Sequence, residues 1–141
     1  MTVRRKVAGA VASVAAAAGL LLTQSTPASA GVWGTLVNNT GYYFTAAKFG
    51  QGSSSCYTWN EYGTYLLDYA TFTCAKTSVK PHTTTGTLYD VDGFTINRSY
   101  NVRWGGGSYM YVGPNVYTRI HDYNKATCNQ NSSGAVYCTI S

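Results

Sequence analysis

From Gly31 onward, the chain alternates between short runs of β-branched and aromatic residues and clusters of turn-forming residues. Alternating apolar and polar positions are typical of β-strands, because successive side chains of a strand point to opposite faces. The stretch TYLLDYATF is the best helix candidate, but its β-branched and aromatic flanks favour a strand. The pattern predicts strands at Val32–Val37, Tyr42–Phe49, Cys56–Trp59, Tyr65–Cys74, Thr84–Val91, Phe94–Trp104, Tyr109–Val112, Val116–His121, Ala126–Cys128 and Ala135–Ile140.

Turn residues separate these runs. Asn38–Gly41 and Asp92–Gly93 favour hairpins, since Asp-Gly supplies the positive φ angles that a tight two-residue turn requires. Gly105–Ser108 and Gly113–Asn115 predict loops. Many short strands in a chain of this length predict an all-β fold, a small single-domain antiparallel barrel or sandwich.

Residues 1–30 have the layout of a signal peptide. Arg4, Arg5 and Lys6 precede an apolar run from Val7 to Leu22, and Ala28–Ser29–Ala30 forms a small-residue cleavage site. The apolar run is short and rich in alanine for a membrane span. The sequence therefore predicts a secreted, extracellular domain at residues 31–141, without a membrane anchor.

Loss of this leader changes the charge of the protein. Seven basic and five acidic residues remain, a formal net charge of +2. Proteins that bind duplex nucleic acid usually carry a clustered basic face. We therefore expect a partner other than duplex nucleic acid.

Four cysteines follow the leader: Cys56, Cys74, Cys128 and Cys138. An even number in a small exported chain indicates two disulfides, and three pairings are open. We favour Cys56–Cys74 and Cys128–Cys138, because the second pair is centred on Ser133 within a plausible hairpin turn. There is no C-x-x-C motif, and the histidines have no metal-like spacing from the cysteines, so we expect no metal and no cofactor.

Candidate catalytic residues are few. Glu61, His121, Arg103 and Arg119 are the residue types of small secreted ribonucleases, in which an acid and a base cleave RNA through its 2′-hydroxyl. No segment reproduces the local motifs of that family. The stretch DVDG at Asp90–Gly93 resembles part of a calcium loop but lacks the later ligands, which favours a turn. We expect a non-catalytic protein, with a ribonuclease as the enzymatic alternative.

The segment Tyr100–Arg119 is the densest candidate for binding. Tyr beside Ser, Gly and Asn gives amphipathic contact area at low entropic cost, as in antibody combining sites. Tyrosines that cover the core of a small β domain are the structural alternative. Five residues of types enriched at interface centres are the candidates for partner binding: Arg103, Trp104, Tyr109, Met110 and Tyr111.

The stretch GVWGTLV at Gly31–Val37 allows two interpretations. It is either an ordinary first strand or an arm that enters a partner's cleft or pairs with a partner's strand edge. The second interpretation adds Val32, Trp33 and Leu36 to the partner-binding candidates.

An alanine-rich leader, about 110 further residues and four cysteines give this chain the layout of small exported actinobacterial β proteins. It resembles secreted protease inhibitors and the adaptor subunit of umbrella toxin particles in this layout, and the resemblance carries over no functional residue. It implies a secreted protein-binding module, either an adaptor of an antibacterial toxin complex or an inhibitor of a secreted hydrolase. Pro81 after Lys80 disfavours a trypsin-type inhibitor. The non-enzymatic alternative is a module that binds surface glycans by stacking sugar rings on Trp33, Trp59 or Trp104.

Overall fold

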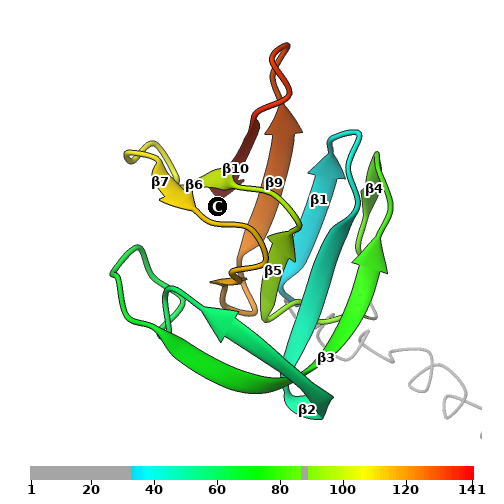
Figure 1. Ribbon diagram of the computed structural model, residues 1–141, viewed down its shortest axis with the longest axis vertical. Coiled ribbons are helices and arrows are strands. Elements are labelled where there is room, and N and C mark those ends of the chain that lie inside the picture. The colour runs from blue at the N-terminus through cyan, green and yellow to red at the C-terminus, as the bar shows by residue number, and fades with distance from the viewer. Residues whose placement is uncertain (1–32, 87–88) are drawn as a thin grey trace, which may run out of the picture.

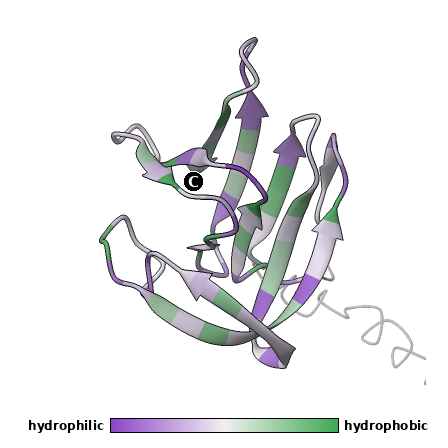
Figure 2. Cartoon of the chain, viewed as in Figure 1, coloured by the Kyte–Doolittle hydropathy of each residue, from purple (hydrophilic) through white to green (hydrophobic). Residues whose placement is uncertain are grey.

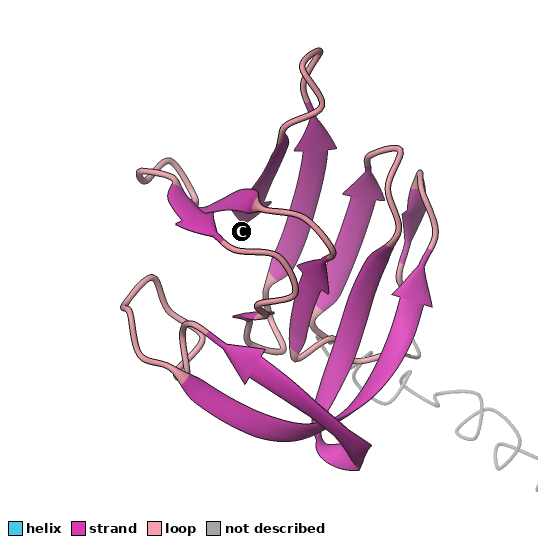
Figure 3. Cartoon of the chain, in the orientation of Figure 1, coloured by secondary structure: helices cyan, strands magenta, loops and turns pink. Residues whose placement is uncertain are grey.

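The computed structural model describes residues 33–86 and 89–141, which form two packed β-sheets (Figures 1 and 3). The predicted signal peptide and Val32 lie outside these residues. The first sheet has the order β4 (Thr83–Thr84), β1 (Thr35–Asn39), β9 (Lys125–Gln130), β10 (Val136–Ile140), β6 (Tyr100–Trp104), β7 (Met110–Val112). The second has the order β3 (Ala70–Val79), β2 (Phe44–Thr58), β5 (Gly93–Ile96), β8 (Thr118–Arg119). The predicted all-β fold is confirmed as a sandwich; the sheets do not close into a barrel.

Most strand pairs are antiparallel, as expected, but β1 pairs parallel with β9, and β10 pairs parallel with β6. β1 lies between β4 and β9, so the described part of the N-terminal segment is an internal strand and not a free arm. Leu36 on this strand is fully buried, which corrects its assignment as a partner-binding residue. At the start of β1, the Thr35 amide donates to the Asn124 carbonyl at 3.0 Å, and the neighbouring Lys125 amide donates to the Ser141 carbonyl at 2.8 Å.

The two predicted hairpin turns are wrong, because each connects strands of different sheets. After β1, the buried Asn38 amide shapes the turn by donating to the Tyr42 carbonyl at 2.8 Å and accepting from the Thr40 hydroxyl at 2.7 Å. Asp92 instead fixes the entry to β5, since its carboxylate accepts from the Phe49 amide at 2.7 Å. At both connections between the sheets, side-chain hydrogen bonds therefore take the place of the main-chain hydrogen bonds of a hairpin.

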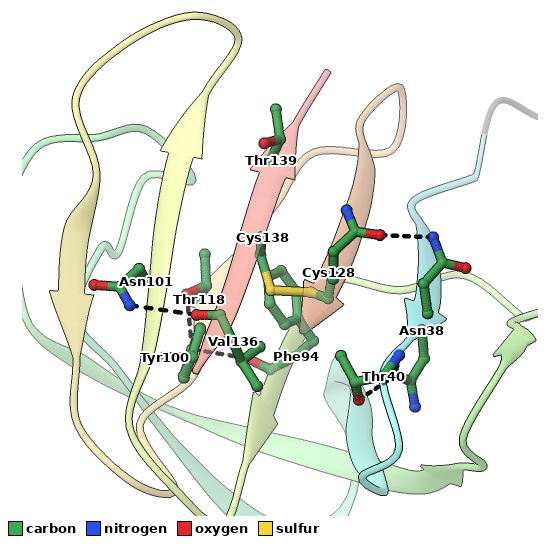
Figure 4. Close-up of a disulfide and its surroundings, with 12 residues drawn as sticks. Asn38, Thr40, Phe94, Tyr100, Asn101, Thr118, Cys128, Val136, Cys138 and Thr139 are labelled. Carbon is green, nitrogen blue, oxygen red and sulfur yellow. Dashed lines mark hydrogen bonds between the residues drawn. A yellow bond between two sulfur atoms is a disulfide. The ribbon is translucent and has the colours of Figure 1, made fainter. Parts of the chain in front are cut away.

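The core between the sheets is continuous and includes a disulfide (Figure 4). Cys128 and Cys138 lie opposite each other on β9 and β10, as the spacing predicted, and their bridge is buried. Tyr100 is also fully buried, and its hydroxyl bonds to the Val116 carbonyl and the Thr118 hydroxyl, both at 2.8 Å. Burial raises the pKa of Tyr100 well above its ordinary value, so this hydroxyl stays neutral. Its hydrogen bonds link it to neighbouring residues of the core.

The β2–β3 hairpin extends beyond the sandwich and has a small core of its own. The register shifts between Phe49 and Ser54, where Gly50 and Gly52 adopt φ angles of 76° and 74°. Glycine tolerates this left-handed conformation, so β2 can bend sharply there. The predicted Cys56–Cys74 disulfide then ties the outer part of the hairpin together. This hairpin ends in the loop of residues 59–69.

Candidate functional site

The β2–β3 loop, residues 59–69, carries an unusual number of exposed apolar side chains. Tyr65, Leu66 and Leu67 are 65%, 61% and 62% exposed, and Tyr62 and Tyr69 are also exposed. Figure 2 colours part of this loop as hydrophobic. Single exposed apolar residues are common, but a contiguous group usually marks a surface that meets a partner.

This loop is held in place at its base. The fully buried Asn60 side chain accepts from the Arg119 amide at 2.7 Å and donates to the Arg119 and Thr64 carbonyls, each at 2.9 Å. The Glu61 amide donates to the Asp68 carbonyl at 2.7 Å and closes the loop above Asn60. The exposed residues therefore protrude from an anchored base, which lowers the entropy that a partner would have to remove on binding.

An aromatic groove lies between the β2–β3 loop and the β6–β7 connection. One part, of about 360 Å³, is lined by Tyr65, Trp104, Gly107, Ser108 and Met110. A second part, of about 290 Å³, shares Tyr65 and Trp104 and adds Gly63, Thr64, His121, Tyr123 and Asn124. Trp104 packs edge-on against the buried Trp59 with ring centroids 5.8 Å apart, which fixes its position between the two parts.

Within the described part of the chain, no Asp, Glu, Lys or Arg lines this groove. The only charged residues of the β2–β3 loop, Glu61 and Asp68, are both acidic. The surface thus combines an aromatic groove, which His121 also lines, with two acidic residues on the loop beside it and Arg119 at the base of that loop.

The structure separates the five partner-binding candidates of the segment Tyr100–Arg119 into three places. Trp104 and Met110 line the groove. Arg103 lies next to Tyr109, with its guanidinium 4.6 Å from the ring centroid, and it donates to the Thr139 hydroxyl. Tyr111 belongs to a separate polar cleft. The five candidates therefore do not form one site.

The three tryptophans differ in exposure. Trp33 is 46% exposed, whereas Trp59 is buried and its indole N–H donates to the Thr118 hydroxyl at 2.9 Å. Trp59 is therefore part of the core and not a platform for sugar rings. Trp104 is partly buried and presents the remainder of its surface to the groove.

Three of the four ribonuclease candidates, Glu61, Arg119 and His121, lie around the β2–β3 loop, whereas Arg103 does not. Arg119 donates to the main-chain carbonyl of Glu61, and its guanidinium lies 4.8 Å from the ring centroid of Phe72. His121 lines the groove and stacks on Tyr123 at 5.4 Å between ring centroids. Arg103 is engaged with Tyr109 and Thr139 instead. Arg119 thus contributes to the support of the β2–β3 loop.

Three carboxylates meet at the start of β5. One oxygen each of Asp90, Asp92 and Asp122 lies within 4.8 Å of the others, a spacing that a metal ion could bridge. Burial raises the pKa of Asp92; its hydrogen bond from the Phe49 amide opposes this, and repulsion from Asp90 and Asp122 adds to it. Asp90 accepts a hydrogen bond from the Gly34 amide at 3.1 Å, so two of the three carboxylates already bind the backbone.

The sequence pattern missed the most exposed part of the site. The pattern predicts a strand at Tyr65–Cys74, but β3 begins only at Ala70, so Tyr65, Leu66 and Leu67 belong to the loop. Asn60 and Gly63 are turn-forming residues and could have indicated a loop in the sequence. In the structure, Gly63 adopts a φ of 70° and packs against the His121 ring.

Comparisons of the chain with models of protein families, with curated proteins and with solved structures found no match. Among the residues that the structure describes, no helix is long and apolar enough to cross a membrane.

Proposed function

We propose that the protein is a secreted, non-catalytic module that binds another secreted protein through the β2–β3 loop and the aromatic groove. The observation that carries this proposal is the exposure of Tyr65, Leu66 and Leu67 on an anchored loop beside the groove. Glycan sites depend on aromatic faces and polar groups, and they have little use for two exposed leucines. Adjacent leucines and tyrosines gain most from burial against a protein.

Two roles remain within this function. An inhibitor of a secreted hydrolase needs a rigid exposed loop, and residues 59–69 lie within the loop closed by the Cys56–Cys74 bridge. Their exposed leucines and tyrosines would suit a hydrolase with an apolar specificity pocket. An adaptor of an antibacterial toxin complex would use the same surface to hold a larger subunit. The two disulfides are compatible with the extracellular location that both roles require.

The test compares capture by the wild-type protein with capture by two variants. Each protein carries a tag on a long flexible linker at its C-terminus, which keeps the support away from the nearby groove. Each is incubated with culture supernatant of the native host, and captured proteins are quantified by mass spectrometry. The site variant is Leu66→Ser with Leu67→Ser. The control is Tyr43→Ser, which removes a comparably exposed apolar side chain from the β1–β2 turn.

We expect the wild type and the control to capture the same secreted protein, and the site variant to lose it. The affinity of the purified partner should fall about thirtyfold or more for the site variant, as for a hot spot worth about 2 kcal/mol. Inhibition of the captured protein's hydrolase activity would identify an inhibitor, and a stable complex with a large subunit would identify an adaptor. Equal capture by all three proteins would contradict the proposal.

A further inference from the structure

A polar cleft of about 470 Å³ lies between the β5–β6 turn, β7 and the β9–β10 turn, and it shares no residue with the aromatic groove. Its polar lining comes from Arg98, Ser99, Asn101, Tyr111 and Ser133. Asn101 belongs to β6 and pairs with Tyr111 of β7, so two of these side chains are placed by the sheet. A site built on paired strands is held more firmly than one built on loops alone.

Arg98 is oriented by an aromatic ring. Its guanidinium lies 3.7 Å from the centroid of Tyr42, and the Tyr42 hydroxyl in turn donates to the Gly134 carbonyl at 3.4 Å. Among the residues that the structure describes, none forms a hydrogen bond or an ion pair with this guanidinium. Its planar set of N–H donors is therefore positioned and unused, which suits two-point binding of a carboxylate.

The charge distribution also favours an anion in this cleft. Among the described residues, Arg98 is the only charged one that lines the cleft, and the neighbouring segments 38–42, 109–113 and 129–135 contain no charged residue. All five acidic residues lie in other segments of the chain. One unopposed positive charge matches a single carboxylate, whereas a polyphosphate backbone would require a longer basic surface.

The remaining groups suit the hydroxyls and the ring of a sugar. Tyr111 is 73% exposed and offers a flat aromatic face. Asn101 donates to the Val136 carbonyl at 3.3 Å (Figure 4), which leaves its side-chain oxygen available as an acceptor. The hydroxyls of Ser99 and Ser133 add groups that can both donate and accept. We propose that this cleft binds a carboxylate-bearing sugar, with Arg98 on the carboxylate and Tyr111 against the ring.

The test is titration of the isotope-labelled protein, followed by the shifts of its backbone amide resonances. The probes are a galacturonic acid trisaccharide, N-acetylneuraminic acid and N-acetylmuramic acid. The methyl ester of the trisaccharide is the neutral control, and acetate is the control for a carboxylate without a sugar. At least one acidic sugar should give saturable shifts at Ser99, Asn101, Tyr111 and Ser133.

Variants then test the role of Arg98. Arg98→Gln should weaken binding of that sugar about tenfold or more, because a charge-assisted hydrogen bond is lost. Arg98→Lys should bind more weakly than the wild type, since it retains the charge but loses the planar pair of donors. Lys125→Gln removes the same charge from the opposite end of β9 and should leave the affinity unchanged.

Three results would overturn this inference: no saturable shift with any of the acidic sugars, tighter or equal binding of the neutral methyl ester, or acetate binding as tightly as the sugar. None of them bears on the proposed protein-binding function, because Leu66 and Leu67, whose variants test that function, belong to the β2–β3 loop and lie outside the cleft. Conversely, loss of partner capture by those variants would leave the sugar titration unchanged.

Discussion

Replacement of Asn60 by alanine tests whether the β2–β3 loop is held by its base. The side chain is fully buried and makes three hydrogen bonds, two with the main chain of Arg119 and one with the carbonyl of Thr64. At about 1 kcal/mol for each bond, Asn60→Ala should lower the free energy of unfolding by about 3 kcal/mol. With a urea m-value of about 2 kcal/mol/M, the unfolding midpoint should fall by about 1.5 M.

Urea unfolding followed by tryptophan fluorescence measures this loss, and amide hydrogen exchange locates it. The Asp68 amide donates to the Trp59 carbonyl at 2.8 Å, and the Gly63 amide donates to the Asn60 carbonyl at 3.0 Å. Both amides should lose more protection in Asn60→Ala than global destabilisation explains, because the loop would open locally. Binding of a partner through the loop should weaken in the same variant.

Asn38→Ala is the matched control. Asn38 is also fully buried and also donates to main-chain carbonyls, those of Tyr42 and Lys80 at 2.8 and 3.0 Å. It should destabilise the protein to a similar extent without selective loss of protection in residues 59–69. A loss below about 1 kcal/mol for Asn60→Ala, or equal loop protection in the two variants, would refute the reasoning.

Two further predictions concern stability. Replacing Cys56 and Cys74 together by alanine should lower the free energy of unfolding by about 3 kcal/mol, as expected for a bridge that closes a loop with a sequence separation of 18; a loss near zero in urea unfolding would show that the unfolded chain gains little freedom. Asp92→Asn should increase stability at neutral pH and reduce its pH dependence. Because the pKa of Asp92 is raised in the folded state, the wild-type protein loses stability as the pH rises above 3.8 and this carboxylate ionises. Parallel curves of stability against pH for the two proteins would contradict this.

Local pattern was sufficient for the disulfides and for several strands, but not for all of them. The pattern predicts one strand at Thr84–Val91, where β4 ends at Thr84, and one strand at Phe94–Trp104, where β5 and β6 belong to different sheets. The residue pattern predicted strands that overlap β9 and β10, and the symmetry of Cys128 and Cys138 about the turn placed them opposite each other. Both features depend on neighbours within a dozen residues. The parallel pairing of β1 with β9 was not predictable in this way, because it joins strands about ninety residues apart.

The candidate site was only partly predictable for a related reason. Leu66 and Leu67 have the composition of a buried strand, and their exposure depends on Asn60 reaching Arg119, which is distant in sequence. Trp104 and Met110 were identified from their residue types, and both do line the groove. Residue type alone could not show that Arg103 and Tyr111 lie outside it.

The start of β1 has a consequence for how the protein is presented to its surroundings. Thr35 pairs with Lys125, and Lys125 is hydrogen-bonded to Ser141, so both ends of the described domain emerge side by side. A protein immobilised through either end would take the same orientation on a surface. The aromatic groove includes Asn124 and would lie near the attachment point, whereas the cleft at Ser133, beyond the far end of β9, would face outward. Tethering at either end would thus leave the polar cleft accessible to ligands and bring the groove close to the molecule or surface that holds the protein.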